Sequence, residues 1–186
     1  MKRSADILLG TLLLIIMLIP MLIIAIWIKL TSAGPVLYWS NRVGKNNQIF
    51  SMPKYRTMSL DAPQVATHLL TDTNQYLTHQ GKFLRKYSLD ELPQLFCILK
   101  GEMSFVGPRP ALYNQKDLIA LRTEHDIHTL VPGLTGYAQI HGRDSITIQE
   151  KVKRDEEYFQ NRSFSMDINI LLKTFIKVLR SEDIKA

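Results

Sequence analysis

The sequence predicts a mostly helical, membrane-associated α/β protein, and three observations lead to this prediction. Residues 7–28 form an almost unbroken apolar run, which is typical of a membrane segment. The remaining chain mixes short strand-like segments with amphipathic helical patterns, and no series of long strands indicates a large sheet. We therefore expect a membrane-anchoring helix within residues 1–35 and one compact domain over residues 36–186.

The composition of the 186-residue chain excludes several classes of protein. A hydrophobic content of 46% is too high for a disordered chain. The single cysteine, Cys97, rules out an internal disulfide framework and a cysteine-rich zinc site, and we expect it to be a buried structural thiol. The net charge of +6 suits phosphates, nucleic acid or anionic lipids and does not choose among them. No Walker A, GxGxxG or nucleic-acid-binding motif is present, so we expect no nucleic-acid partner.

The apolar N-terminal segment is long enough to cross a bilayer, since 22 helical residues span about 33 Å. Pro20 lies near its middle, where it removes an amide donor and clashes with the Ile16 carbonyl, so we expect a bend. Basic residues flank both ends, with Lys2 and Arg3 before the run and Lys29 after it. Positive charges prefer the cytoplasmic side, which favours a hairpin that enters the membrane and returns. A kinked spanning helix remains an equal alternative.

Short strands and a polar stretch follow the membrane segment. Residues 36–39 read as a strand or as an aromatic anchor at the membrane interface. Residues 41–47 read as a turn, and residues 48–52 as the returning strand. Residues 59–80 are polar and mixed, which is typical of a loop with at most one short helix.

A helix is predicted within residues 83–100, ahead of a stop at Gly101. Ser88 and Glu91 have the spacing of a capping box, whereas Pro93 fits better if the helix begins at Asp90. Either start places Asp90 and Glu91 at the helix N-terminus. Next comes a rigid segment in which Pro108 and Pro110 present Arg109. Further helices are expected over residues 112–128, 150–160 and 167–180, and turn-rich loops over residues 131–136 and 142–144.

The last predicted helix carries apolar residues on one face, while its basic residues lie off that face. A core-packing helix would explain this pattern. We favour a helix in the membrane interface, with its apolar side toward lipid, because a membrane segment already exists.

The adjacent carboxylates Asp90 and Glu91 are the candidate reactive groups. Acidic residues at a helix start are often only caps. They are also able to supply a nucleophile for a phosphate and to hold Mg²⁺, which takes one or two carboxylates with substrate phosphates. Arg85, Arg109 and Arg143 favour the second interpretation, because the guanidinium fork suits phosphate oxygens. Together these residues indicate a phosphate-bearing substrate at a lipid surface.

These motifs together resemble the bacterial sugar transferases, the monotopic phosphoglycosyl transferases, in their minimal single-domain form. The resemblance covers nearly the whole chain, and a departure is Ile19, since many members have serine before the bend proline. The matching segments are Lys2-Arg3, Lys54-Tyr-Arg-Thr-Met58, Gly81 to Leu95, Leu99 to Pro110, Val131 to Gly136 with Gln139, Gly142-Arg143 and Tyr158 to Asp167.

The resemblance implies an enzyme on the cytoplasmic face of the bacterial inner membrane. Such enzymes move a sugar 1-phosphate from a UDP-sugar to undecaprenyl phosphate, release UMP, and thereby begin surface polysaccharide or glycoprotein glycan assembly. Their re-entrant helix embeds in inner-membrane lipids.

The resemblance also implies roles for individual residues. Asp90 would be the nucleophile that forms a covalent phosphosugar intermediate, and Glu91 would bind Mg²⁺ with it. Arg109, between Pro108 and Pro110, would bind phosphate. Arg85 and Arg143 would contribute to donor binding. Lys54 and Arg56 would belong to a motif near the site. The membrane anchor and its bend would involve Lys2, Arg3 and Pro20.

Two rival interpretations remain open at the level of the sequence. A membrane adaptor would use residues 1–35 only to attach a basic domain that recruits partners. An inactive relative would bind nucleotide sugar without turning it over. The sequence does not identify the sugar.

Overall fold

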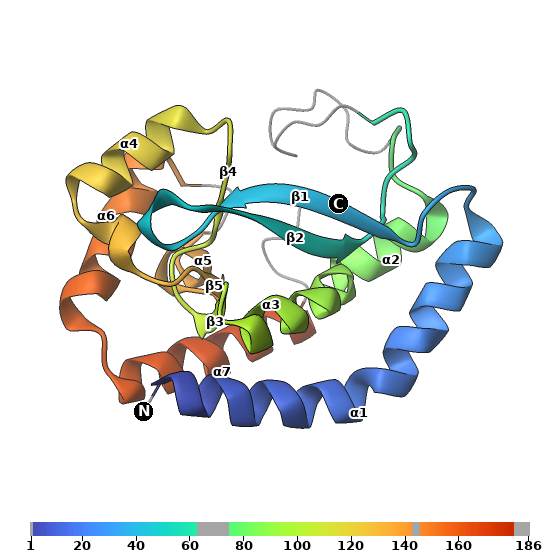
Figure 1. Ribbon diagram of the computed structural model, residues 1–186, viewed down its shortest axis with the longest axis horizontal. Helices are drawn as coiled ribbons and strands as arrows, with labels where there is room; N and C mark the ends of the chain where they lie inside the picture. The colour runs from blue at the N-terminus through green and yellow to red at the C-terminus, as the bar shows by residue number, and fades with distance from the viewer. Residues whose placement is uncertain (1, 63–74, 143–145, 181–186) are drawn as a thin grey trace.

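A three-stranded antiparallel sheet crosses the middle of the molecule in the computed structural model, which describes residues 2–62, 75–142 and 146–180 (Figure 1). Its strands are β1 (Leu37–Val43), β2 (Ile49–Tyr55) and β4 (Ala111–Leu112), in the order β2-β1-β4. Leu37 pairs with Tyr55 and Val43 with Ile49, and the short helix η1 (Lys45–Asn47) closes the hairpin. Pro53 lies in the edge strand β2, where a missing amide donor is tolerated. The predicted strand pair is confirmed and is longer than expected.

A second, parallel pair of strands lies below this sheet and joins β3 (Ser104–Val106) to β5 (Gly133–Thr135). The prediction of a turn-rich loop over residues 131–136 was therefore wrong. Its glycines allow two backbone segments to pack closely instead of forming turns. A Cβ atom added at Gly133 or Gly136 would lie 2.1 Å from backbone atoms of Gly107.

The predicted helix within residues 83–100 is divided into three pieces: α2 (His79–Lys86), η3 (Leu89–Gln94) and α3 (Leu95–Lys100). Ser88 separates the first two, with left-handed backbone (φ 54°), and makes no capping hydrogen bond, so the predicted capping box does not form. Asp90 and Glu91 nevertheless occupy the first turn of η3, as expected. Gly101, with φ 91°, ends α3 as predicted.

Helices α4 (Lys116–Glu124), η4 (Ile127–Thr129), α5 (Tyr137–Ile140) and α6 (Ile148–Asn161) gather at one end of the molecule, and α7 (Phe164–Arg180) runs back along its lower edge (Figure 1). The helices predicted over residues 150–160 and 167–180 are confirmed. The one predicted over residues 112–128 is shorter and is interrupted before η4 because Asp126 adopts a left-handed conformation.

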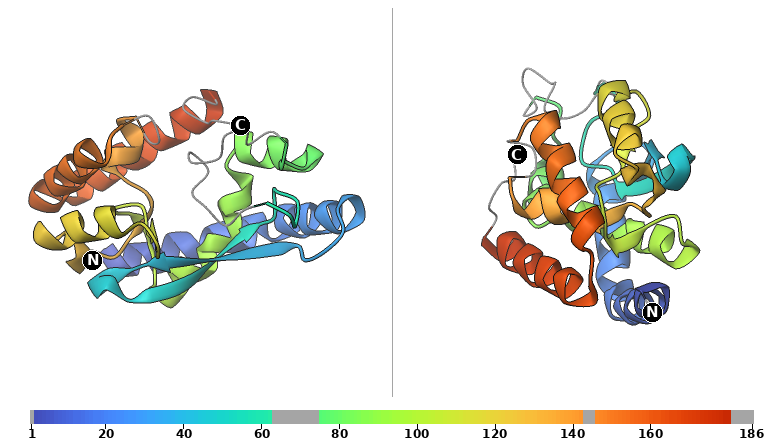
Figure 2. Two further views of the ribbon diagram at one scale, coloured as in Figure 1. Left: turned by 90° about the horizontal axis from the view of Figure 1, so that it is seen from above. Right: turned by 90° about the vertical axis from the view of Figure 1, so that its left-hand side faces the viewer.

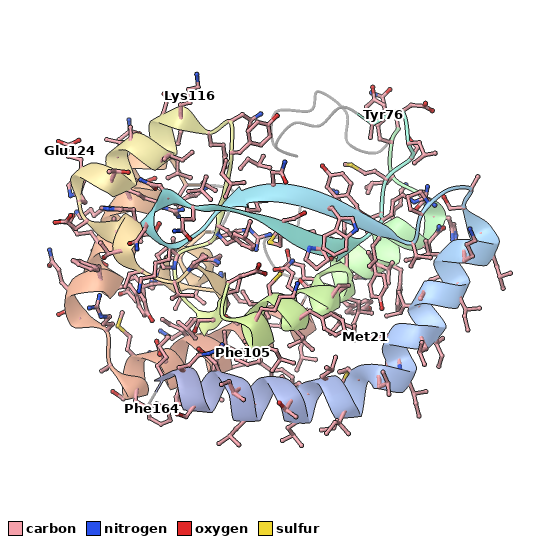
Figure 3. The ribbon with its side chains drawn as sticks, in the orientation of Figure 1. Met21, Tyr76, Phe105, Lys116, Glu124 and Phe164 are labelled. Atoms are coloured by element: carbon pink, nitrogen blue, oxygen red, sulfur yellow. The ribbon has the colours of Figure 1, made fainter. Side chains whose placement is uncertain are left out.

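The apolar N-terminal segment is one helix, α1 (Lys2–Thr31), with Pro20 inside it and a visible bend (Figure 1). Figure 3 labels Met21 at this bend, and the Met21 carbonyl accepts a 2.8 Å hydrogen bond from the Tyr55 hydroxyl. Within the described residues, α1 is the one helix long and apolar enough to cross a membrane. Whether it re-enters or spans stays a prediction, as does the division at residue 35.

Both ends of α1 are attached to the rest of the molecule. Arg3 donates to the carbonyls of Ile98 and Leu99 at the end of α3, at 2.5 and 2.6 Å. At the other end, Arg56 donates to the carbonyls of Ser32 and Ala33. The helix therefore lies along the molecule instead of projecting from it.

The main core joins α3, β3, α5, α6 and α7, and Cys97 is buried in it as predicted. A second cluster packs the bend of α1 against α2 and β2. The N-terminus of α1 and the start of α7 lie near each other at the lower edge of the molecule, and the two helices diverge from there (Figures 1 and 2). Both leave large apolar side chains exposed, including Leu8, Leu12, Ile15, Ile16, Ile19, Leu172, Phe175, Ile176 and Leu179.

Candidate active site

The carboxylate pair of η3 lies buried beneath strand β2. Asp90 and Glu91 are only 7% and 8% exposed. The left-handed turn at Ser88 ends α2 and redirects the chain, so that the first turn of η3 brings both acids toward Lys54 of β2. Burial of two acids is costly unless cations or hydrogen bonds compensate for it. The neighbouring residues provide that compensation unequally.

Glu91 is held between two cations. Its Oε1 accepts 2.8 Å and 2.6 Å hydrogen bonds from Lys54 Nζ and Arg109 Nη2. All three side chains are largely shielded from solvent. Such pairing stabilises the ionised carboxylate and links β2, η3 and the segment after β3.

Asp90 differs from Glu91, because its carboxylate accepts no hydrogen bond from the residues that the structure describes. Burial raises the pKa of Asp90, and the negative charge of Glu91 adds to this effect. The charges of Lys54, Arg85 and Arg109 oppose it. Asp90 is thus a desolvated carboxylate surrounded by cations, which is the environment expected of a nucleophile or of a ligand for a hard cation.

The backbone around Arg109 is fixed at three successive residues. The Pro108 carbonyl accepts from the Gly133 amide at 2.9 Å, and the Pro110 carbonyl accepts from Arg42 Nη1 at 3.2 Å. The Arg109 carbonyl accepts from Arg122 Nη1 at 2.8 Å. The extended segment predicted from the two prolines therefore delivers the guanidinium to Glu91 from a rigid support.

Sequence reasoning missed two arginines that support this segment. Arg122 lies inside α4 and is bound by Asp155 of α6, at 3.0 Å from Nε and 2.6 Å from Nη2. Arg42 lies in β1. Its guanidinium lies near Arg109, and burial, followed by that charge, lowers its pKa to about 10. No sequence signal marks either residue, because their partners lie far away along the chain.

The other predicted site residues are dispersed. Arg85 Nε donates to Thr57 Oγ1 at 3.0 Å, and its charge acts on the Asp90 carboxylate. The Arg56 guanidinium donates to the carbonyls of Ser32 and Ala33, which follow α1. Lys2 binds Asp167 at 2.5 Å and Tyr158 at 2.9 Å. Arg143 lies outside the described residues.

The acids offer a limited set of metal ligands. Among residues 2–62, 75–142 and 146–180, no group of three or more His, Cys, Asp or Glu side chains is placed to hold a metal ion. Asp90 and Glu91 fit Mg²⁺ in the manner of sites that complete the coordination with water and substrate phosphates. The carboxylate of Asp90, which is not engaged by described residues, provides the hard oxygen ligand that such a site needs.

A cavity of about 380 Å³ adjoins Glu91 and has mostly apolar walls. Glu91 and Arg109 line it, together with residues of α1, η3, α5 and α7. Its volume is in the range of small-molecule sites.

Comparison with known proteins relates the chain to sugar transferases. A family model described as "Bacterial sugar transferase" matches residues 1–181. The chain is 42% identical over 160 residues to an uncharacterized sugar transferase of Bacillus subtilis, with 85% of this chain and 77% of that protein covered. It is 37% identical over 183 residues to the UDP-N-acetylgalactosamine-undecaprenyl-phosphate N-acetylgalactosaminephosphotransferase of Aeromonas hydrophila, with 96% and 43% covered.

A third relative is the undecaprenyl-phosphate galactose phosphotransferase of Salmonella typhimurium, which is 35% identical over 198 residues. That match covers 98% of this chain and 41% of the relative. The chain therefore spans less than half the length of the Aeromonas and Salmonella proteins.

Proposed function

The chain belongs to the bacterial sugar transferase family, and on this basis we propose that it transfers a sugar 1-phosphate from a UDP-sugar to undecaprenyl phosphate and releases UMP. The names of the Aeromonas and Salmonella relatives support this acceptor. The reaction would begin the assembly of a surface polysaccharide or of a glycoprotein glycan. The observation that carries the proposal is the buried Asp90 carboxylate beside Lys54, Arg85 and Arg109.

In the proposed first step, an Asp90 carboxylate oxygen attacks the phosphorus that carries the sugar. An Oδ–P bond forms, the P–O–P bond breaks, and UMP leaves with the bridging oxygen and its electron pair. In the second step, an oxygen of the lipid phosphate attacks the same phosphorus. The Oδ–P bond then breaks, and Asp90 returns as a free carboxylate. Covalent catalysis of this kind lets UMP depart before the lipid acceptor reacts.

Attack of a carboxylate on a pyrophosphate brings negative charges together, so the site must offset their repulsion. Lys54 and Arg109 are fixed by Glu91 before substrate arrives, and Arg85 adds a third positive charge near Asp90. Mg²⁺ held by Asp90 and Glu91 would, when bound, neutralise phosphate charge. Desolvation of Asp90 strips water from the attacking oxygen.

We further propose that α1 enters the inner membrane and returns to the cytoplasmic side. Both ends of α1 are bound to one body. Arg3, at the first end, donates to the carbonyls of Ile98 and Leu99. Arg56 donates to the carbonyls of Ser32 and Ala33 at the other end. A spanning helix would separate these contacts by the thickness of the bilayer. Residues 1–35 would then anchor the protein, while residues 36–186 would carry out catalysis with the basic site at headgroup level.

The proposal is tested by intact-protein mass spectrometry of the purified protein with Mg²⁺ and a panel of UDP-sugars, without lipid acceptor. We expect a mass gain of one phosphosugar with the correct donor and its loss in Asp90→Asn. The adduct should disappear when undecaprenyl phosphate is added.

A parallel UMP assay with undecaprenyl phosphate present detects an intermediate that hydrolyses quickly. Absence of both adduct and UMP release across the panel would contradict the proposed reaction. Binding of a UDP-sugar without UMP release would instead identify an inactive relative.

A further inference from the structure

We propose that the cavity beside Glu91 and Arg109 holds the first part of the apolar chain of the polyprenyl phosphate acceptor. This inference rests on the proposed function and adds where the lipid binds. Polyprenyl phosphate carries an anionic head on a hydrocarbon chain, so its site needs cations at one end and apolar walls beyond them. Arg109 and Lys177 are the cations that line the cavity, and the rest of its walls are mostly apolar.

The walls of the cavity come from helices that are distant in the sequence. The N-terminal half of α1 contributes Leu13 and Met17, and η3 and α3 contribute Leu92 and Leu95. Helix α7 supplies much of the opposite wall. A nucleotide would leave its ribose, base and phosphates unpaired on such walls, whereas a hydrocarbon chain loses only contact with water there. The α7 residues that line the cavity are Leu171, Thr174, Phe175, Lys177 and Val178.

The polar end of the cavity lies beside the segment that carries Arg109. Gln139 lines the cavity, and both polar atoms of its side-chain amide are buried without a partner among the described residues. Its Oε1 lies next to Gly136, and Gly136 packs against the Gly107 backbone two residues before Arg109. A buried amide without partners costs free energy, so a ligand that supplies a hydrogen-bonding group is favoured at this end.

The apolar end is continuous with the surface proposed to meet the membrane. Helices α1 and α7 both line the cavity, and they diverge from a common lower edge of the molecule (Figures 1 and 2). Phe175 lines the cavity while 64% of it remains exposed, and its neighbours Leu172 and Leu179 are exposed to a similar extent. A lipid chain is therefore able to pass from the bilayer into the cavity without crossing water.

Neighbouring residues on α7 provide matched variants. Leu171→Trp and Val178→Trp place a large ring in the cavity, and their controls Leu172→Trp and Leu179→Trp place the same ring on the exposed face. We expect each cavity variant to raise the KM for undecaprenyl phosphate by about tenfold or more. Acceptor-free adduct formation from the UDP-sugar should stay within about twofold of wild type. The two controls should change neither quantity by more than about twofold.

A photoreactive polyprenyl phosphate with a diazirine on its first isoprene units gives a readout independent of turnover. In detergent or vesicles, we expect labelling of peptides that contain Leu13, Met17 or Leu171. Excess undecaprenyl phosphate should suppress the labelling, whereas phosphatidylglycerol vesicles should not. If Leu171→Trp fails to fold, Val178→Trp and the labelling experiment still test the inference.

Three outcomes would overturn the inference: labelling confined to other segments, labelling that phosphatidylglycerol suppresses equally, or an unchanged acceptor KM in a folded cavity variant. The second would identify a site for ordinary bilayer lipid. Failure of the proposed function would appear separately, as absence of adduct and UMP, while specific labelling of the cavity would persist.

Discussion

Asp90 and Glu91 are adjacent in sequence, but the fold gives them opposite electrostatic environments. Glu91 accepts direct hydrogen bonds from Lys54 and Arg109, whereas Asp90 is influenced by cations that donate no hydrogen bond to it in the described structure. This division suits one carboxylate that organises the site and another that remains available to react. Two predictions at the residue scale follow from the raised pKa of Asp90.

In the proposed mechanism only ionised Asp90 attacks, so the rate of adduct formation should rise with pH through an apparent pKa above the ordinary aspartate value of 3.8. Lys54→Met removes a charge that lowers the pKa of Asp90, so it should move this rise to higher pH. The initial rate of UMP release, measured from pH 4 to 8, gives the apparent pKa of the rise separately from the maximal rate. An unchanged position in Lys54→Met would argue against Asp90 as the titrating group.

Replacement of Asp90 should not cost stability at neutral pH. The pKa of Asp90 is higher in the folded than in the unfolded protein, so the folded state binds the proton more tightly. The contribution of Asp90 to stability therefore falls as pH rises through that raised pKa. Asp90→Asn removes the buried charge and should leave Tm at pH 7 equal to or above that of wild type while abolishing the adduct. A large fall in Tm would assign Asp90 a structural role.

At the scale of elements, the ion pair between α4 and α6 holds the backbone of Arg109 in place. Arg122 and Asp155 are nearly inaccessible, and Arg122 also donates to the carbonyl of Arg109. Burial raises the pKa of Asp155, although the adjacent Arg122 opposes this. Asp155→Ala leaves Arg122 buried without its carboxylate and should lower the free energy of unfolding by about 3–5 kcal/mol. Chemical denaturation in detergent measures this loss.

Glu157→Ala is the matched control for this prediction, because Glu157 lies on the same helix and pairs with Arg154 at the surface. Its removal should change stability only slightly. Equal effects of the two substitutions would mean that the buried pair contributes nothing specific to the support of Arg109.

At the scale of the whole molecule, both ends of α1 are attached to one body, which restricts how the proposed membrane helix could be placed in a bilayer. Asp6, near the first end, accepts hydrogen bonds from Ser104 Oγ at 3.1 Å and from the Phe105 amide at 3.2 Å. Figure 3 places Phe105 beside the N-terminal half of α1. One face of α1 thus packs on the rest of the molecule, and its exposed apolar face is the one that the proposal places against lipid.

Single cysteines at Ser4 and Ala33, in a Cys97→Ala background, should both react with a membrane-impermeant maleimide only when the cytoplasmic side is accessible. Inverted vesicles and intact cells provide the two orientations. Labelling of the two positions from opposite sides would mean that α1 spans the membrane, in conflict with its contacts at both ends.

Local sequence determined much of the secondary structure. The hairpin, the helix end at Gly101, the last two helices and the long apolar helix all follow from patterns that near neighbours enforce. The adjacency of Asp90 and Glu91 and the rigid presentation of Arg109 are likewise local. The failures occurred where a short motif had two possible structures: Ser88 adopts a left-handed turn instead of a capping box, and the glycines after Pro132 form a parallel strand.

Only the tertiary structure decided which cations meet the acids. Lys54 and Arg56 are two residues apart in the sequence, yet Lys54 binds Glu91 and Arg56 binds the end of α1, because β2 reaches the acids while the chain after it turns toward α1. The roles of Arg42 and Arg122 and the cavity between α1 and α7 depend on contacts between distant segments. Hydrophobic periodicity records which face of each element is buried, but it does not specify the partner that buries it, and packing supplies that information.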